Sequence, residues 1–139
     1  MKIHQWSQFR PTGLLNPRDV KRVERMIREI EPNVQSVQID DIYVSMFGAR
    51  FMRNDVVLLG SSHGHACGLV WFHCLMDGTQ KTVCEVWPLI RGDALRRHGK
   101  YRITDEPQLI QTSDIHAAAV YKIDKTIATA LWPRTYAYP

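Results

Sequence analysis

The chain has 139 residues, of which 45% are hydrophobic and 23% charged, and it carries a formal charge of +4. This length fits one compact domain, and the composition excludes a disordered or fibrous protein. Such a mildly basic charge indicates nucleic acid as a partner only where the positive residues cluster.

Residues 1–15 are predicted to form an N-terminal arm, and a helix is predicted over residues 16–31. Asn16 is a helix-capping residue, Pro17 suits the first turn, and Asp19 complements the positive end of the helix dipole. The apolar residues then recur at steps of three and four, as on one face of a helix, at Val20, Val23, Ile27 and Ile30. Pro32 predicts that the helix has ended.

Beyond the helix the apolar period changes toward two, which predicts a β domain over residues 34–132. Strands are expected around 37–39, 42–47 and 56–59, and then over 68–75 and 82–87. Asp77-Gly78 separates the last two runs. Because both residues tolerate a positive φ, the pair predicts a β-hairpin at this point.

The polar, basic stretch 91–102 is predicted to be a loop, and 109–112 another strand. Segments 117–121 and 127–132 are expected to form a last hairpin that turns at Asp124-Lys125, although their alanines also suit a helix. Residues 133–139 are taken as a tail. The expected fold is a single α+β domain, mainly antiparallel β, built as a small, partly open barrel with one N-terminal amphipathic helix.

Part of the β pattern resembles the bromo-adjacent-homology family. The similar segments are an Asp-Val-Val-Leu strand at 55–58, a strand pair that ends at Trp87, and a Leu–Ser–Ile segment within 109–115, together about half the chain. The resemblance implies a non-catalytic protein-interaction module of chromatin-associated or mobile-element proteins. The opening helix and the basic stretch 91–102 depart from the family pattern. No residues of this sequence can be assigned to a peptide-binding aromatic cage.

The sequence gives no indication of a membrane span or a signal peptide. The longest uncharged stretch, around residues 60–75, is interrupted by histidines and serines, and the N-terminus has no apolar run. Three cysteines, an odd number, are poor material for a disulfide framework. We therefore expect reduced thiols and an intracellular protein, cytoplasmic or nuclear.

The basic stretch 91–102 is the first candidate site. Its five Lys/Arg stand against one Asp, and with an adjacent tyrosine they suit contact with a phosphate backbone. The predicted nucleic-acid-binding residues are Arg91, Arg96, Arg97, Lys100, Arg102 and Tyr101. The alternative is an ordinary solvated loop.

The helix carries a second group of cations at Arg18, Lys21, Arg22 and Arg25. These residues lie about opposite the apolar stripe and form a possible second phosphate-facing patch. Glu24 with Arg28, and Arg25 with Glu29, have the four-residue spacing of surface ion pairs, which favours a solvated helix face.

Histidines and cysteines suggest two further hypotheses. On an extended strand His63, His65 and Cys67 share one face, as zinc ligands would, yet the sequence has no spaced Cys or His pair. An enzyme would use Cys67 or Cys74 as nucleophile with a histidine, His65 or His73, as base. Structural thiols and a polar turn are the favoured interpretation, and no metal or cofactor is predicted.

The sequence as a whole favours a non-enzymatic binding module that contacts nucleic acid through the basic stretch. A second hypothesis makes the partner a protein complex, as for an accessory or inhibitor factor of a mobile element or virus. A Cys/His-dependent enzyme is the third hypothesis. The three differ in which side chains the fold leaves exposed together.

Overall fold

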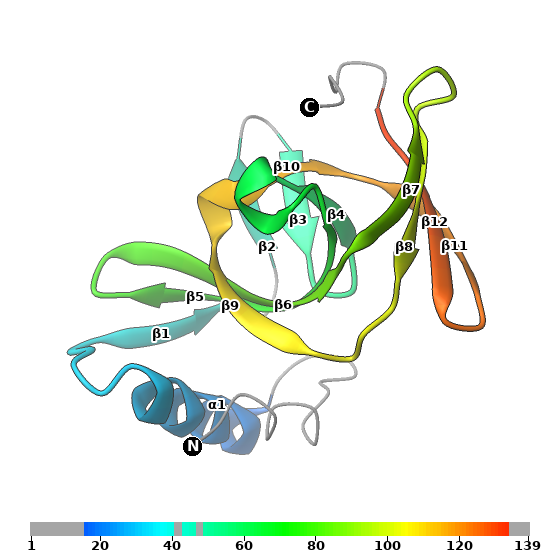
Figure 1. Cartoon of the computed structure of the whole chain (residues 1–139). Helices are drawn as coiled ribbons and strands as arrows, with labels where there is room; N and C mark the ends of the chain where they lie inside the picture. The colour runs from blue at the N-terminus through cyan, green and yellow to red at the C-terminus, as the bar shows by residue number, and fades with distance from the viewer. Residues whose placement is uncertain (1–15, 41–42, 47–48, 134–139) are drawn as a thin grey trace.

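A computed structural model describes residues 16–40, 43–46 and 49–133 (Figure 1). The predicted arm at 1–15 lies outside the described residues, as does the predicted tail apart from Pro133. These residues form fifteen elements, and the strands among them that pair are all antiparallel.

Helix α1 (Pro17–Ile30) begins and ends as the sequence predicts. The Asn16 side chain accepts the backbone N–H of Asp19 at 2.9 Å, and this bond satisfies one of the free donors of the first turn. The apolar stripe is buried against the sheet, where Val23 and Ile27 meet Trp71 and Phe72 in one core cluster. Burial of this stripe holds the helix against the sheet.

The larger sheet is built around one long hairpin. Strands β5 (Cys67–Met76) and β6 (Thr79–Trp87) pair over nearly their whole length, and Asp77 and Gly78 turn with φ of 50° and 82°. The Asp77 carboxylate also accepts the backbone N–H groups of Gln35 and Ser36, at 3.0 and 2.7 Å. The Asp-Gly hairpin of the prediction is confirmed, and its aspartate also fixes the entry into β1.

Six strands make up this sheet. Its order is β10-β4-β5-β6-β9, with β1 paired to the remaining part of β5. The other members are β1 (Val37–Asp40), β4 (Val56–Leu59), β9 (Pro107–Gln111) and β10 (Ile115–Ala118). The four residues of β4 are all buried, as the uninterrupted apolar run predicts. A separate pair, β2 (Tyr43–Met46) and β3 (Ala49–Met52), accounts for the strand expected at 42–47, of which 42 and 47 are outside the described residues.

A second sheet has four strands in the order β11-β12-β8-β7. Its members are β7 (Leu89–Asp93), β8 (His98–Arg102), β11 (Val120–Asp124) and β12 (Ile127–Leu131). The predicted loop at 91–102 is therefore wrong, because this stretch is the hairpin β7–β8. The last hairpin forms as expected, but it turns at Lys125-Thr126, and residues 117–118 belong to β10.

The two larger sheets pack against each other without closing into a barrel, because the terminal strands of each pair on one side only among the described residues. Trp87, at the end of β6, lies in a cluster with Tyr101, Ala128 and Ala130 of the second sheet. The prediction of an α+β fold that is mainly antiparallel β is confirmed. Among the described residues, no helix combines the length and the apolar run that crossing a bilayer requires.

Candidate nucleic-acid interface

The three thiols are all in the core. Cys67, Cys74 and Cys84 are free and at most 3% exposed. Burial raises the pKa of each thiol from 9.0 to about 12, so each stays protonated at neutral pH. His73 is also buried, and its two ring nitrogens lie 2.8 Å from the Thr82 hydroxyl and 2.7 Å from the Phe51 carbonyl oxygen. The proposed Cys–His nucleophile thus has neither an accessible thiol nor a free base in this histidine.

The histidines near residue 63 do not share a strand face with Cys67. Residues 61–63 form a short 3-10 helix, and His65 has a φ of 60°, because the chain turns here before β5 begins. The His63 Nε2 atom lies 2.9 Å from a carboxylate oxygen of Asp114. Within the described residues no three His, Cys, Asp or Glu side chains are grouped as metal ligands.

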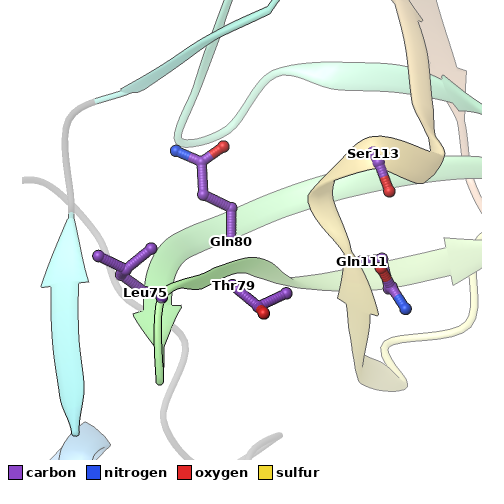
Figure 2. Close-up of a pocket in the computed structure, with 6 residues that line it drawn as sticks. Leu75, Thr79, Gln80, Gln111 and Ser113 are labelled. Atoms are coloured by element: carbon purple, nitrogen blue, oxygen red, sulfur yellow. The ribbon is translucent and has the colours of Figure 1, made fainter.

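An open hollow of about 560 Å³ lies at the turn end of the β5–β6 hairpin (Figure 2). The side chains of Thr79, Gln80, Gln111 and Ser113 line it, together with the half-exposed Leu75. This lining holds no charged residue. The hollow therefore offers hydrogen bonds but no electrostatic attraction for a highly charged ligand.

The β7–β8 hairpin instead exposes most of the predicted cations. Along β8, buried Gly99 and Tyr101 alternate with exposed Lys100 and Arg102, because successive side chains of a strand point to opposite faces of its sheet. Arg91 of β7 is opposite Lys100 in the register and is also exposed. These three cations therefore share the solvent face of the four-stranded sheet.

The register extends this set by a residue that the sequence analysis missed. Lys100 is opposite Thr129 of β12, and Thr129 is opposite Lys122 of β11. Side chains opposite each other in an antiparallel sheet lie on the same face, so Arg91, Lys100, Thr129 and Lys122 form one row across all four strands. Lys122 is far from Arg91–Arg102 in sequence, and only the strand pairing reveals that it belongs with them.

All of the net positive charge of the chain comes from this sheet. Residues 89–102 and 120–131 carry seven Lys/Arg and two Asp, a formal charge of +5. The other eleven Lys/Arg and twelve Asp/Glu give the rest of the chain a formal charge of −1. The modest net charge of the protein thus conceals a strongly basic sheet.

The cations of this face, which we call the basic face, are mostly unpaired among the described residues. Arg91, Lys100, Arg102 and Lys122 make no ion pair there. Arg96, at the hairpin tip, lies 3.7 Å from a carboxylate oxygen of Asp93, and both side chains are well exposed. An ion pair of this kind is weak. Arg97 is half-buried and has a φ of 53°, as part of the same turn.

Tyr101 is not part of the basic face. Its side chain is 1% exposed and lies between the two sheets, where its hydroxyl oxygen accepts the indole N–H of Trp132 at 3.1 Å. The prediction that Tyr101 is a contact residue is wrong, because it depended on 91–102 being a loop. In a strand the same residue must face opposite to Lys100, and it is directed into the core. Trp71, Trp87 and Trp132 are also buried in the core.

The cations of helix α1 are a weaker candidate. Residues 16–31 carry five Lys/Arg and four Asp/Glu, a formal charge of +1. In Figure 1 the helix lies at lower left and the four-stranded sheet at right, so the two basic regions are separate surfaces. The helix face therefore has acidic neighbours that the basic face largely lacks.

Comparison with protein families, with curated proteins and with solved structures finds no match for this chain. The resemblance to bromo-adjacent-homology domains therefore stays a prediction. The evidence for the basic face as a candidate site is therefore its geometry and its charge.

Proposed function

We propose that the protein is a non-enzymatic module that binds nucleic acid through the basic face. The observation that carries the proposal is the row of Arg91, Lys100 and Lys122 across one solvent-exposed sheet face, in a sheet of formal charge +5 within a chain of +4. Arg102 extends the row along β8, and Arg96 and Arg97 extend it at the hairpin tip.

Neighbouring strands are about 4.8 Å apart, so Arg91 lies about one strand spacing from Lys100, and Lys100 about two from Lys122, with Thr129 between them. Lysine and arginine bound to phosphates release condensed counterions, which supplies affinity that is independent of base sequence. Tyr101, the aromatic residue of the predicted site, is buried, so no aromatic side chain of this set is available to stack on a base. The proposed binding is therefore electrostatic and largely sequence-independent.

The test is a titration of labelled single-stranded and duplex oligonucleotides at several salt concentrations. We expect binding at low salt that weakens steeply as salt rises. Replacing Arg91→Glu together with Lys100→Glu should weaken binding at least tenfold and reduce the slope of log affinity against log salt by about 1.5, since each phosphate contact contributes about 0.7 to 0.9.

The matched control is Lys21→Glu with Arg25→Glu on helix α1, because it makes the same charge change at exposed residues of the other basic region. This variant should retain more of the wild-type affinity than the basic-face variant does. Equal loss in both variants would show a dependence on net charge alone. Absence of binding at low salt, or loss only in the helix variant, would overturn the proposal.

A second candidate function, binding to an acidic protein surface, has one observation in its favour. Val120 and Leu131 are 71% and 49% exposed, and the register puts them opposite each other on the same face as Lys100. Protein interfaces commonly combine such apolar residues with charges at the rim. Capture of a host protein from a nuclease-treated lysate, lost with Arg91→Glu and Lys100→Glu, would favour this function over the first.

A further inference from the structure

Strand β11 is an exposed edge with an apolar character. It is the terminal strand of the four-stranded sheet, and no described strand pairs with its outer side. The five residues Val120–Asp124 are all exposed, including Val120 at 71%, Tyr121 at 42% and Ile123 at 51%. Unpaired strand edges with exposed apolar side chains are templates for pairing with another strand.

The other terminal strands of the two larger sheets carry features that hinder such pairing. The registers of β7 and β10 are interrupted by irregularities, and β9 begins with Pro107. β1 is in contact with helix α1. Bulges, prolines and covering elements are the usual protections of sheet edges. The register of β11 with β12 is regular over all five residues, the strand has no proline, and all five residues are exposed, so among the described residues nothing of this kind protects the edge.

The turn that joins β11 to β12 determines which backbone groups point outward. Asp124 is opposite Ile127 across a two-residue turn, and such a closing pair is hydrogen-bonded. Hydrogen-bonded pairs alternate with non-hydrogen-bonded ones along an antiparallel ladder. Val120, Lys122 and Asp124 therefore direct their backbone groups to β12. Tyr121 and Ile123 direct theirs to the open edge.

We propose that two copies of the protein pair antiparallel through β11, with Lys122 at the two-fold axis. In this register Tyr121 is opposite Ile123 of the second copy on both sides of the axis, and each pair exchanges two backbone hydrogen bonds. Aromatic and β-branched residues are a favourable cross-strand combination. The strand is thus complementary to itself in both its backbone groups and its exposed apolar side chains.

The charges fit the same register. The two Lys122 side chains face each other at the axis, which is unfavourable, but each also lies diagonal to Asp124 of the other copy, within reach of a long side chain. A shift that would put Lys122 directly opposite Asp124 places Tyr121 opposite Lys125. Lys125 has a φ of 58° and belongs to the turn, so that shift loses the outer hydrogen bonds.

The dimer would double the basic face. Antiparallel pairing through an edge continues the sheet across the two-fold axis and leaves the same face of both copies on one side. The row of Arg91, Lys100 and Lys122 would then run on into the second copy, as one eight-stranded surface. The proposed dimer is inferred from strand β11 alone and does not depend on the proposed function. The importance of a doubled basic face for binding does rest on that function.

A disulfide trap tests the register directly. At the axis Lys122 forms a non-hydrogen-bonded pair with itself, where the Cα atoms lie about 4.5 Å apart, within the range for a disulfide. Lys122→Cys should therefore give a covalent dimer under mild oxidation without nucleic acid. The native cysteines are at most 3% exposed and should contribute little to cross-linking in the folded protein. Val120→Cys is the control, since Val120 would be opposite Asp124 of the second copy.

The second measurement is analytical ultracentrifugation of proteins that carry no added cysteine. The wild type should form dimers as concentration rises, and Ile123→Lys should shift it to monomer. Ile90→Lys on β7, where Ile90 is 48% exposed at the opposite edge, should leave the dimer intact. A monomer at all concentrations, a dimer that survives Ile123→Lys, or equal cross-linking of Val120→Cys and Lys122→Cys would overturn the proposal. A dimer that binds no nucleic acid would overturn the proposed function alone.

Discussion

The two larger sheets of this protein are both antiparallel, yet they differ in what covers them. In the six-stranded sheet nine of the ten residues of β5 are buried, and helix α1 packs against Trp71 and Phe72. In the four-stranded sheet β8 alternates between buried and exposed residues, and β11 is exposed throughout. The central strands of one sheet are enclosed by the rest of the molecule, whereas the other sheet presents a face to solvent.

If the proposed function is right, this difference separates the residues that stabilise the fold from those that bind the partner. The enclosed sheet contains buried polar groups that are tied to one another, such as Glu85, which accepts the indole N–H groups of Trp71 at 3.2 Å and Trp87 at 3.0 Å. The open sheet carries cations on its solvent face, and Arg91, Lys100 and Lys122 make no ion pair within the described residues. Substitutions in the first sheet should therefore affect folding, and those on the outer face of the second should affect binding.

The largest effect is expected at Glu85, which is fully buried. Glu85→Ala removes the acceptor of two buried indole groups and leaves a cavity, so we expect a loss of at least about 3 kcal/mol in the free energy of unfolding. Urea denaturation followed by tryptophan fluorescence measures it. Glu85→Gln retains one acceptor oxygen and should cost less; equal stability of the alanine variant and the wild type would show that this network does not hold the sheet.

The next effect depends on pH. Burial, and secondarily the charge of Glu85, raises the pKa of the Cys84 thiol from 9.0 to about 12. The unfolded chain releases this proton near pH 9 and the folded protein keeps it to about pH 12, so stability is fully present below pH 9 and falls as pH rises toward 12. Cys84→Ala should make that fall shallower by up to about 1.4 kcal/mol per pH unit. Denaturation curves at pH 8, 9 and 10 test this, and parallel curves for both proteins would contradict it.

A smaller effect distinguishes the two faces of β8. A Cβ atom at Gly99 would lie 2.9 Å from the Tyr101 hydroxyl and 3.0 Å from a Leu89 methyl carbon, on the buried face. Gly99→Ala should therefore destabilise the fold by about 1 to 3 kcal/mol through overpacking. Thermal and urea unfolding of this variant provide the measurement.

The smallest effect on stability is expected at the adjacent residue on the other face. Lys100 is exposed and makes no ion pair among the described residues, so Lys100→Ala should change the free energy of unfolding by less than about 0.5 kcal/mol. The same substitution should weaken binding to nucleic acid. If Lys100→Ala proved more destabilising than Gly99→Ala, the assignment of faces would be reversed.

The contrast between the sheets also explains which elements could be predicted from the sequence and which could not. The helix, β4 and the β5–β6 hairpin follow from aliphatic runs, a capping asparagine and an Asp-Gly turn. Strand β8 was not predicted because its buried residues are Gly99 and Tyr101. Without an aliphatic residue the segment has the composition of a polar loop. The available signal was the alternation of His98, Lys100 and Arg102 with those two residues.

The candidate site was predicted in part for a related reason. Its cations at Arg91–Arg102 are close in sequence, and a cluster of that kind is visible without a structure. Lys122 is added by the pairing of β8 with β12 and of β12 with β11, which composition does not show. Tyr101 was included wrongly because the face of a residue is undefined until its strand is known.

The most direct test of the account is an amide NMR titration of the isotope-labelled protein with a short oligonucleotide at low salt. If the open sheet is the binding surface, the largest shifts should fall in residues 89–102 and 120–131, and they should disappear as salt is raised. Shifts that centre on helix α1 or on the hollow at Thr79 and Gln111, or no shifts at low salt, would contradict it.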